Sequence, residues 1–247
     1  KLAFFDVLLG EKPPISPGDL MYQRLLAIDD VEVSEFAEEY IQEHSFAELC
    51  DNAILPAIHQ LEKDHREDVL PDATRNEIYK TLKQMIAEVT QPGKSEVAMA
   101  SVLLIPANHI GDEIAALMLG AELTFRGVPV ETLSSKLLAS EIVEQVIARK
   151  PPLVVISVLP PTSVLAAASL VKRIEGRVPE VRTMAAVWPS PDGDTEKRHE
   201  RMRRAGADDI LTSIAKAGEE IAKLSAHLPK ADQAEKEEIF EPRVQEV

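Results

Sequence analysis

The second half of the chain alternates short, uninterrupted apolar runs with amphipathic segments, and this rhythm constrains the fold more than any other feature. Strands buried on both faces of a sheet read as continuous runs of Val, Ile and Leu, whereas apolar positions every three or four residues are typical of helices. The apolar runs occupy residues 101–105, 128–133, 153–158, 181–187 and 209–211. The helices that follow them are expected at 111–126, 138–149, 163–176, 194–205 and 214–228. Five such units predict an α/β domain over residues 98–228, with a doubly wound, flavodoxin-like parallel sheet of order 2-1-3-4-5.

The preceding part of the chain has a helical rhythm only. Residues 16–90 repeat apolar side chains at helical spacing in four segments, which predicts an N-terminal four-helix bundle. Ser16 before Pro17 is typical of a helix start, and Ser34 is the expected N-cap of the second helix. Pro56 is expected to kink the third helix or to mark its start. The other segments are interpreted as a leader at 1–15, a linker at 91–97 and a disordered acidic tail at 229–247.

The charge balance excludes several classes of partner. The chain has 27 basic and 42 acidic residues, so its formal net charge of −15 repels nucleic acid and anionic lipid. A basic cluster over residues 197–204 is interpreted as the solvated face of a helix. The single cysteine, Cys50, excludes an internal disulfide and is expected to be packed and inert, which fits a cytoplasmic location.

Ligands of an open parallel sheet bind beyond the carboxyl ends of its strands. Three loops form that edge in the predicted fold, at residues 106–111, 159–163 and 188–193. The loops lack the carboxylates of a magnesium-dependent phosphoacceptor site, the glycines of a dinucleotide site and the Ser/Thr-rich loop of a flavin site. We also find no recognisable pairing of a nucleophile with a base, so the sequence does not predict an enzyme.

Three short motifs and the order of the parts carry a family resemblance. They are Gly111 at a helix start, Ser157-Val158-Leu159 at a strand end and Gly206-Ala207-Asp208 before the last strand. A helical bundle followed by an α/β domain with these motifs resembles the cobalamin (B12)-binding modules of methionine synthase, corrinoid proteins and B12-dependent regulators. In that family, D-x-H-x-x-G after the first strand supplies a histidine that ligates cobalt. S-x-L lines the slot for the nucleotide tail of the cofactor, and two glycines after the fourth strand make room for that tail.

The chain departs from this pattern at two of the family's contact points. In the register set by Gly111, Asn108 stands at the histidine position and Pro106 at the aspartate position. A shift by one residue brings in His109 but leaves no partner carboxylate in the motif. Trp188 stands where the glycine pair is expected and would fill the slot. The resemblance therefore implies no histidine-ligated cobalamin, and it leaves open cobalamin with its own base attached, another small ligand, or no cofactor.

Several side chains have more than one interpretation. The candidate binding residues are Asn108, His109, Gly111, Ser157, Leu159, Thr162 and Trp188. Trp188 could stack on a flat ligand or plug the slot, and Ser163 could bind a ligand or cap its helix. A metal site is not expected. The charged group on the third helix is interpreted as a solvated face, and it consists of His59, Glu62, Asp64 and His65.

The sequence thus predicts a regulatory or sensory module, with a corrinoid carrier subunit of a methyltransferase as one alternative. A second alternative is a cofactor-free interaction domain. It rests on residues 8–27, which resemble the soluble C-terminal region of some bacterial permease-type membrane proteins. The partner would then be another protein or the chain's own membrane domain. By analogy with the family, the bundle is expected above Asn108, Thr162 and Trp188, or swung away on a hinge at Pro92-Gly93.

Overall fold

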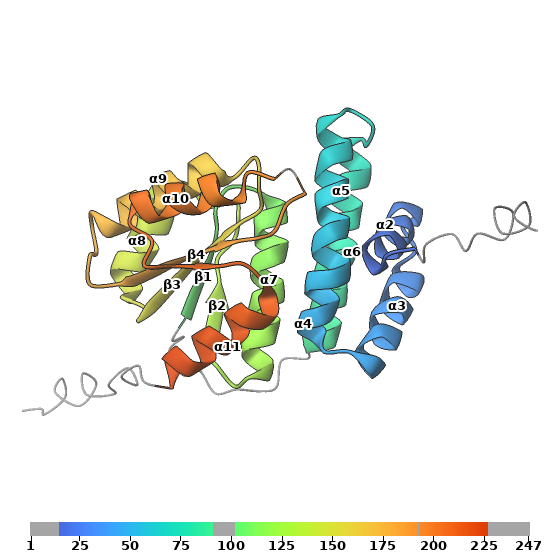
Figure 1. Cartoon of the computed structure of the whole chain (residues 1–247), viewed down its shortest axis with the longest axis horizontal. Helices are drawn as coiled ribbons and strands as arrows, with labels where there is room; N and C mark the ends of the chain where they lie inside the picture. The colour runs from blue at the N-terminus through green and yellow to red at the C-terminus, as the bar shows by residue number, and fades with distance from the viewer. Residues whose placement is uncertain (1–14, 91–101, 192, 227–247) are drawn as a thin grey trace, which may run out of the picture.

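The computed structural model describes residues 15–90, 102–191 and 193–226, so the predicted leader (except Ile15), linker and tail lie outside the described residues. The N-terminal part is helical, as predicted (Figure 1). Its elements are α2 (Pro17–Ala27), α3 (Asp30–Glu43), α4 (Phe46–Leu49), η1 (Cys50–Ile54), α5 (Leu55–Arg66) and α6 (Asp72–Thr90). Because α4, η1 and α5 follow one another without a break, they form one long helix, and the bundle has the four helices expected.

The α/β part follows the predicted alternation closely. Its strands are β1 (Val102–Pro106), β2 (Val130–Thr132), β3 (Leu153–Val158), β4 (Arg182–Val187) and β5 (Asp209–Leu211). Its helices are α7 (Ile110–Phe125), α8 (Ala139–Arg149), α9 (Val164–Glu175), α10 (Thr195–Ala205) and α11 (Ile214–Ser225). Every pairing in the sheet is parallel and the strand order is β2-β1-β3-β4-β5, which confirms the predicted fold class.

The helix starts in the bundle correct one detail of the sequence analysis. Ser16 caps α2 as predicted, and its hydroxyl accepts a hydrogen bond from the backbone N–H of Asp19 at 3.1 Å. Ser34 is not a cap, because α3 begins four residues earlier. The carboxylate of Asp29 accepts the N–H groups of Val31 and Glu32, so the first turn forms there.

Pro56 lies just after a turn of π-helix, η1, within the long third helix. A proline inside a helix has no N–H to donate and its ring crowds the carbonyl four residues earlier. A π turn adds one residue and widens the helix at that point. The long helix therefore continues past Pro56. Cys50, in the same turn, is fully buried as expected, and burial raises the pKa of its thiol.

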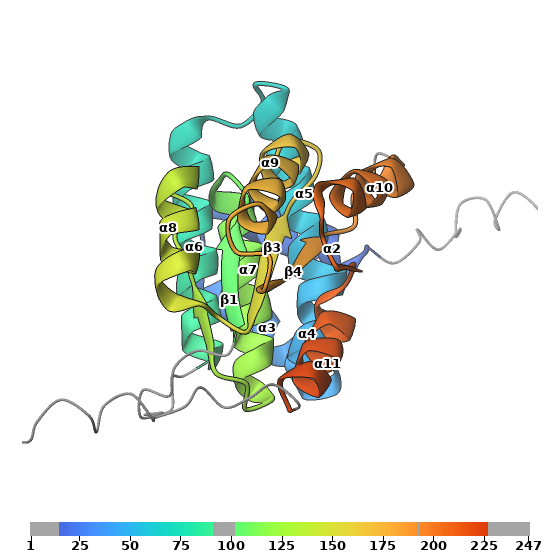
Figure 2. The same cartoon turned by 90° about the vertical axis from the view of Figure 1, so that its left-hand side faces the viewer.

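The sheet has two differently covered faces. Helices α8, α9 and α10 cover one face, and the bundle lies behind the sheet when viewed from their side (Figure 2). Helices α7 and α11 cover the other face, and the bundle packs on these two helices (Figure 1). The bundle therefore lies beside α7 as a third layer. Of the two expected positions, the one over the strand ends was wrong, and the hinge at Pro92-Gly93 on which the other depends lies outside the described residues.

Apolar and polar contacts join the bundle to the α/β part. One continuous apolar core runs from the bundle through α7 and α11 to the sheet. The Phe46 and Phe125 rings meet edge to face with centroids 5.3 Å apart. Asp51 of η1 accepts the backbone N–H groups of Ile214 and Ala215, so a bundle carboxylate satisfies the start of α11. Within the described residues, no helix is long and apolar enough to cross a membrane.

Candidate functional site

The loops after β1 and β3 meet at the carboxyl edge of the sheet. These strands are neighbours, and the chain leaves them toward opposite faces, because α7 packs on the bundle side and α9 on the other. Such a switch point is where open parallel sheets bind ligands. The candidate residues Asn108, His109, Thr162 and Leu159 therefore come together here, as the sequence predicts from the loop positions.

A buried carboxylate that the sequence analysis did not select, Asp112, holds the two loops together. It is 0% exposed. It accepts the backbone N–H of Asn108 at 3.0 Å, of His109 at 3.0 Å and of Leu159 at 2.6 Å. It also accepts the hydroxyl of Ser163 at 2.6 Å. Burial raises the pKa of Asp112, although His109 and these hydrogen bonds favour its charged form.

Both ring nitrogens of His109 are engaged with the protein. Nδ1 accepts the backbone N–H of Gly111 at 3.1 Å, so a neutral ring carries its proton on Nε2. Nε2 lies 2.7 Å from the Thr162 hydroxyl oxygen and 3.0 Å from that of Ser163. The Ser163 hydroxyl donates its hydrogen bond to Asp112. Its oxygen is therefore the acceptor in the contact with His109, and Nε2–H is the donor. The one free lone pair of the ring, on Nδ1, therefore points to a backbone N–H and not to a ligand.

His109 has no carboxylate at the partner position of the family motif, but the structure places one beside it from outside that position. Asp112 follows His109 by three residues, and its Oδ2 lies 3.7 Å from Nδ1. The family motif places the aspartate before the histidine, whereas here it follows. Ser163 is corrected too: its side chain makes no cap hydrogen bond and bonds to Asp112 instead.

Ser163, His109 and Asp112 thus form a contact that the sequence analysis did not anticipate. In a hydrolytic triad, the serine gives its proton to the histidine. Here the hydroxyl of Ser163 is 0% exposed and donates to the carboxylate. The arrangement therefore fixes the loops and does not present an activated nucleophile.

Trp188 follows β4 on the face of the sheet that α7 and the bundle cover. It is 1% exposed, and its indole Nε1 donates to the Ser157 hydroxyl at 2.9 Å. Ser157 in turn donates to the backbone carbonyl of Asp112 at 2.8 Å. The indole is thus packed and hydrogen-bonded beside Ser157 within the protein.

Gly111 marks a close approach between the bundle and the site. A Cβ atom at Gly111 would lie 2.9 Å from the Leu159 side chain and 3.0 Å from the Tyr79 hydroxyl. Tyr79 belongs to α6, is 2% exposed and donates its hydroxyl proton to Glu62. Arg75 holds the same carboxylate at 2.7 Å. The space that the glycine leaves is therefore occupied by the chain's own side chains.

The remaining side chains singled out in the sequence lie outside this network, which Asn108 joins only through its backbone N–H. Asn108 is exposed. The interpretation of the third-helix group as a solvated face was wrong for His59 and Glu62, which are buried. His65 pairs instead with Asp72 at 2.8 Å. Across residues 15–90, 102–191 and 193–226, no three His, Cys, Asp or Glu side chains are grouped so that they could hold a metal ion.

A bundle packed on a parallel sheet of this order, with a switch point beside the first strand, is the fold of cobalamin-binding corrinoid proteins. The monomethylamine corrinoid protein of Methanosarcina barkeri matches with a TM-score of 0.58 and 16% identity, over 84% of this chain and 98% of that one.

Two further solved structures are similar to the chain. The methanol:cobalamin methyltransferase complex MtaBC of Methanosarcina barkeri gives a TM-score of 0.38 and 16% identity, over 87% of this chain and 81% of that one. A cobalamin-binding protein of Desulfitobacterium hafniense gives 0.40 and 13% identity, over 82% and 96%. No protein-family model and no curated protein matches the sequence.

Proposed function

We propose that the chain is a regulatory module with the cobalamin-binding architecture that does not take cobalamin in the histidine-ligated form. The observation that carries this proposal is the position of Trp188. Its indole is buried beside Ser157, in the place where the family resemblance puts the nucleotide tail. Filling that place with a hydrogen-bonded side chain leaves no room for the tail while the indole stays there.

The state of His109 supports the same conclusion independently. Ligation of a metal needs a free lone pair on one ring nitrogen and a partner for the other. Here Nδ1 accepts a backbone N–H and Nε2 donates to hydroxyl oxygens. To present Nε2 to cobalt, the ring would have to move its proton to Nδ1 and give up the contact with Gly111. Asp112 already accepts four hydrogen bonds.

The carboxyl edge still offers a surface for another ligand or for a protein partner. Leu138 at the start of α8 is 66% exposed, and Leu165 at the start of α9 is 67% exposed. Both helices begin where their preceding strands end, so these leucines lie on the same edge as Thr162. Exposed apolar side chains mark an interaction surface when they form one patch, and these two leucines begin helices that are in contact with each other. We therefore infer that the regulatory contact is made at this edge of the sheet.

Equilibrium dialysis and visible spectroscopy with hydroxocobalamin test the proposal. Wild-type protein should not produce a histidine-ligated spectrum. Asn108→His should fail to restore one, because Trp188 still fills the slot. The triple variant Pro106→Asp, Asn108→His, Trp188→Gly removes all three obstacles and should gain corrinoid affinity if it folds, as circular dichroism would report. Tight, histidine-ligated binding by the wild type would overturn the proposal.

A corrinoid carrier for a methyltransferase is the second candidate. The observation that favours it is the contact between His109 and Asp112 at the switch point, 3.7 Å from nitrogen to oxygen. If the wild type binds hydroxocobalamin and His109→Ala abolishes the ligated spectrum, the carrier role is supported. If neither protein binds any corrinoid, a cofactor-free interaction domain accounts for the result.

A further inference from the structure

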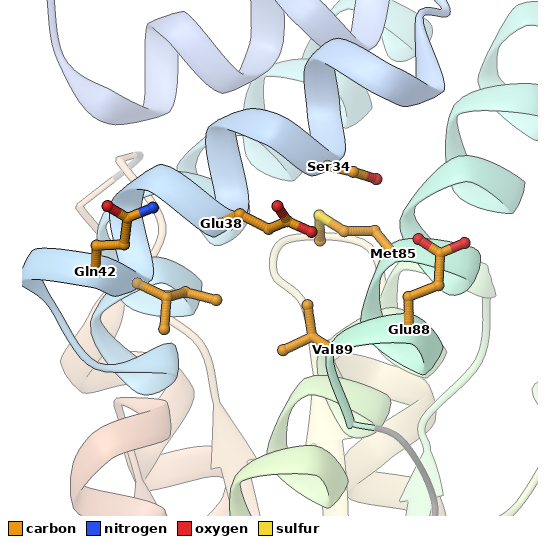
Figure 3. Close-up of a pocket in the computed structure, with 7 residues that line it drawn as sticks. Ser34, Glu38, Gln42, Met85, Glu88 and Val89 are labelled. Atoms are coloured by element: carbon orange, nitrogen blue, oxygen red, sulfur yellow. The ribbon is translucent and has the colours of Figure 1, made fainter.

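A groove runs between α3 and α6 on the bundle, with a volume of about 450 Å³ (Figure 3). Its floor is apolar and is formed by Met85, Ile41 and Val89. Glu38 and Gln42 of α3 line one wall and Glu88 of α6 lines the other. α3 lies on the side of the bundle that faces away from the sheet (Figure 1), so this groove is separate from the carboxyl edge.

The helix α3 is acidic along its length, and Glu38 is the carboxylate among its residues that line the groove. Residues Asp30–Glu43 contain six carboxylates and no Lys or Arg. Among the residues that the structure describes, no ion pair involves α3. Glu88 on the opposite wall accepts only the amide of Gln84 at 2.9 Å within the described part of the chain. The groove therefore combines an apolar floor with negative charge on both walls.

We propose that this groove docks a basic amphipathic helix of a partner protein. Apolar side chains of that helix would contact Ile41 and Val89, which are only partly buried and lie beside the buried Met85. Lys or Arg residues that flank the apolar ones would pair with Glu38 on one wall and with Glu88 on the other. Residues three or four apart share one face of a helix, so a single helix presents this pattern. The inference concerns a different surface from the proposed function and stands without it.

The test uses the full chain and a defined probe. The probe is a fluorescently labelled synthetic helix with Leu at positions i, i+3 and i+7, flanked by Lys. We expect saturable binding by fluorescence anisotropy, weakened about tenfold or more in Glu38→Lys with Glu88→Lys, because two attractive pairs become repulsive. Both residues are exposed, so these changes should not unfold the protein.

The matched control is Glu219→Lys with Glu220→Lys on α11, where both residues are also exposed. This control changes the net charge by the same amount, and we expect an affinity within about twofold of the wild type, after screening by salt. A second probe with Gln in place of Leu should lose most of the binding. Equal weakening by both double variants, equal binding of the two probes, or no saturable binding by the wild type would each overturn the proposal.

Discussion

The two faces of the sheet are built on different principles. Helices α8, α9 and α10 cover one face with a single layer whose core is mainly aliphatic, although Arg198 and His199 of α10 are also buried and no carboxylate of these three helices is. Helices α7 and α11 and the bundle cover the other face with two layers that bury charged groups as well as apolar ones. The buried carboxylates on this side are Glu62, Asp112, Glu113 and Glu122. Aliphatic packing tolerates many sequences, whereas buried charge requires particular partners, so specificity is concentrated on the bundle side.

The largest difference between the faces should come from Trp188. Replacing it by Ala leaves a cavity on the bundle side and should lower the free energy of unfolding by about 3–5 kcal/mol. Trp188→Phe keeps most of the volume but loses the hydrogen bond to Ser157, and should cost about 1 kcal/mol. Urea denaturation measures both values. If Trp188→Ala lowers the free energy of unfolding by less than Trp188→Phe does, the surrounding residues close the cavity and the indole is not a structural plug.

Asp112 should have the next largest effect. Asp112→Ala leaves buried N–H groups of both loops without an acceptor, and we expect a loss of about 3 kcal/mol. The matched control on the other face is Thr183→Val, since Thr183 is also 0% exposed but its hydroxyl donates only to the carbonyl of Val181 at 3.3 Å. That control should cost about 1 kcal/mol or less. Equal losses for the two variants would remove the distinction between the faces.

The smallest effect concerns Glu113, which joins the bundle to the loop after β2. Burial alone would raise the pKa of Glu113, but hydrogen bonds from Lys83 and Ser135 outweigh it and lower that pKa. A lowered pKa stabilises the fold above the unfolded-state value of about 4.3, and this contribution is lost as pH falls through the folded pKa. Lys83→Met should therefore cost about 1 kcal/mol at pH 7, since the Lys83 side chain is 37% exposed and its charge is partly screened.

The cost of Lys83→Met should shrink as the pH falls below about 4, because protonated Glu113 no longer attracts the ammonium. Lys80→Met is the control, since Lys80 pairs with exposed Glu77 on the same helix. It should change stability by only a few tenths of a kcal/mol. A cost for Lys83→Met that stays constant with pH would mean that the lysine contributes through packing and not through charge.

The fold could be predicted because its signals are local. The strand β3 was predicted at its observed bounds from a run of aliphatic residues, and the start of α2 followed from Ser16 and Pro17. The position of the bundle could not be predicted in this way. It depends on contacts such as Asp51 with the start of α11, which are far apart in the sequence.

The positions of the loops at the candidate site could be predicted, but the hydrogen bonds between them could not. The strand ends located the loops, and the spacing of the motif directed attention to Asn108, which proved to be exposed. The spacing of His109 and Asp112, three residues apart at a helix start, is that of a capping box and could have identified the carboxylate. No local pattern could show that Asp112 also accepts hydrogen bonds from the backbone N–H of Leu159 and the hydroxyl of Ser163, in the loop after β3.

The central claim is that the protein does not offer His109 to cobalt, and electron paramagnetic resonance of Co(II) cobalamin tests it most directly. The reduced cofactor is mixed with uniformly nitrogen-15-labelled protein, so that a ligating protein nitrogen is distinguished from the cofactor's own base by its coupling to the cobalt electron. We predict a spectrum without coupling to labelled nitrogen. Coupling to labelled nitrogen that disappears in His109→Ala would contradict the account and show that the ring leaves Gly111 to ligate the metal.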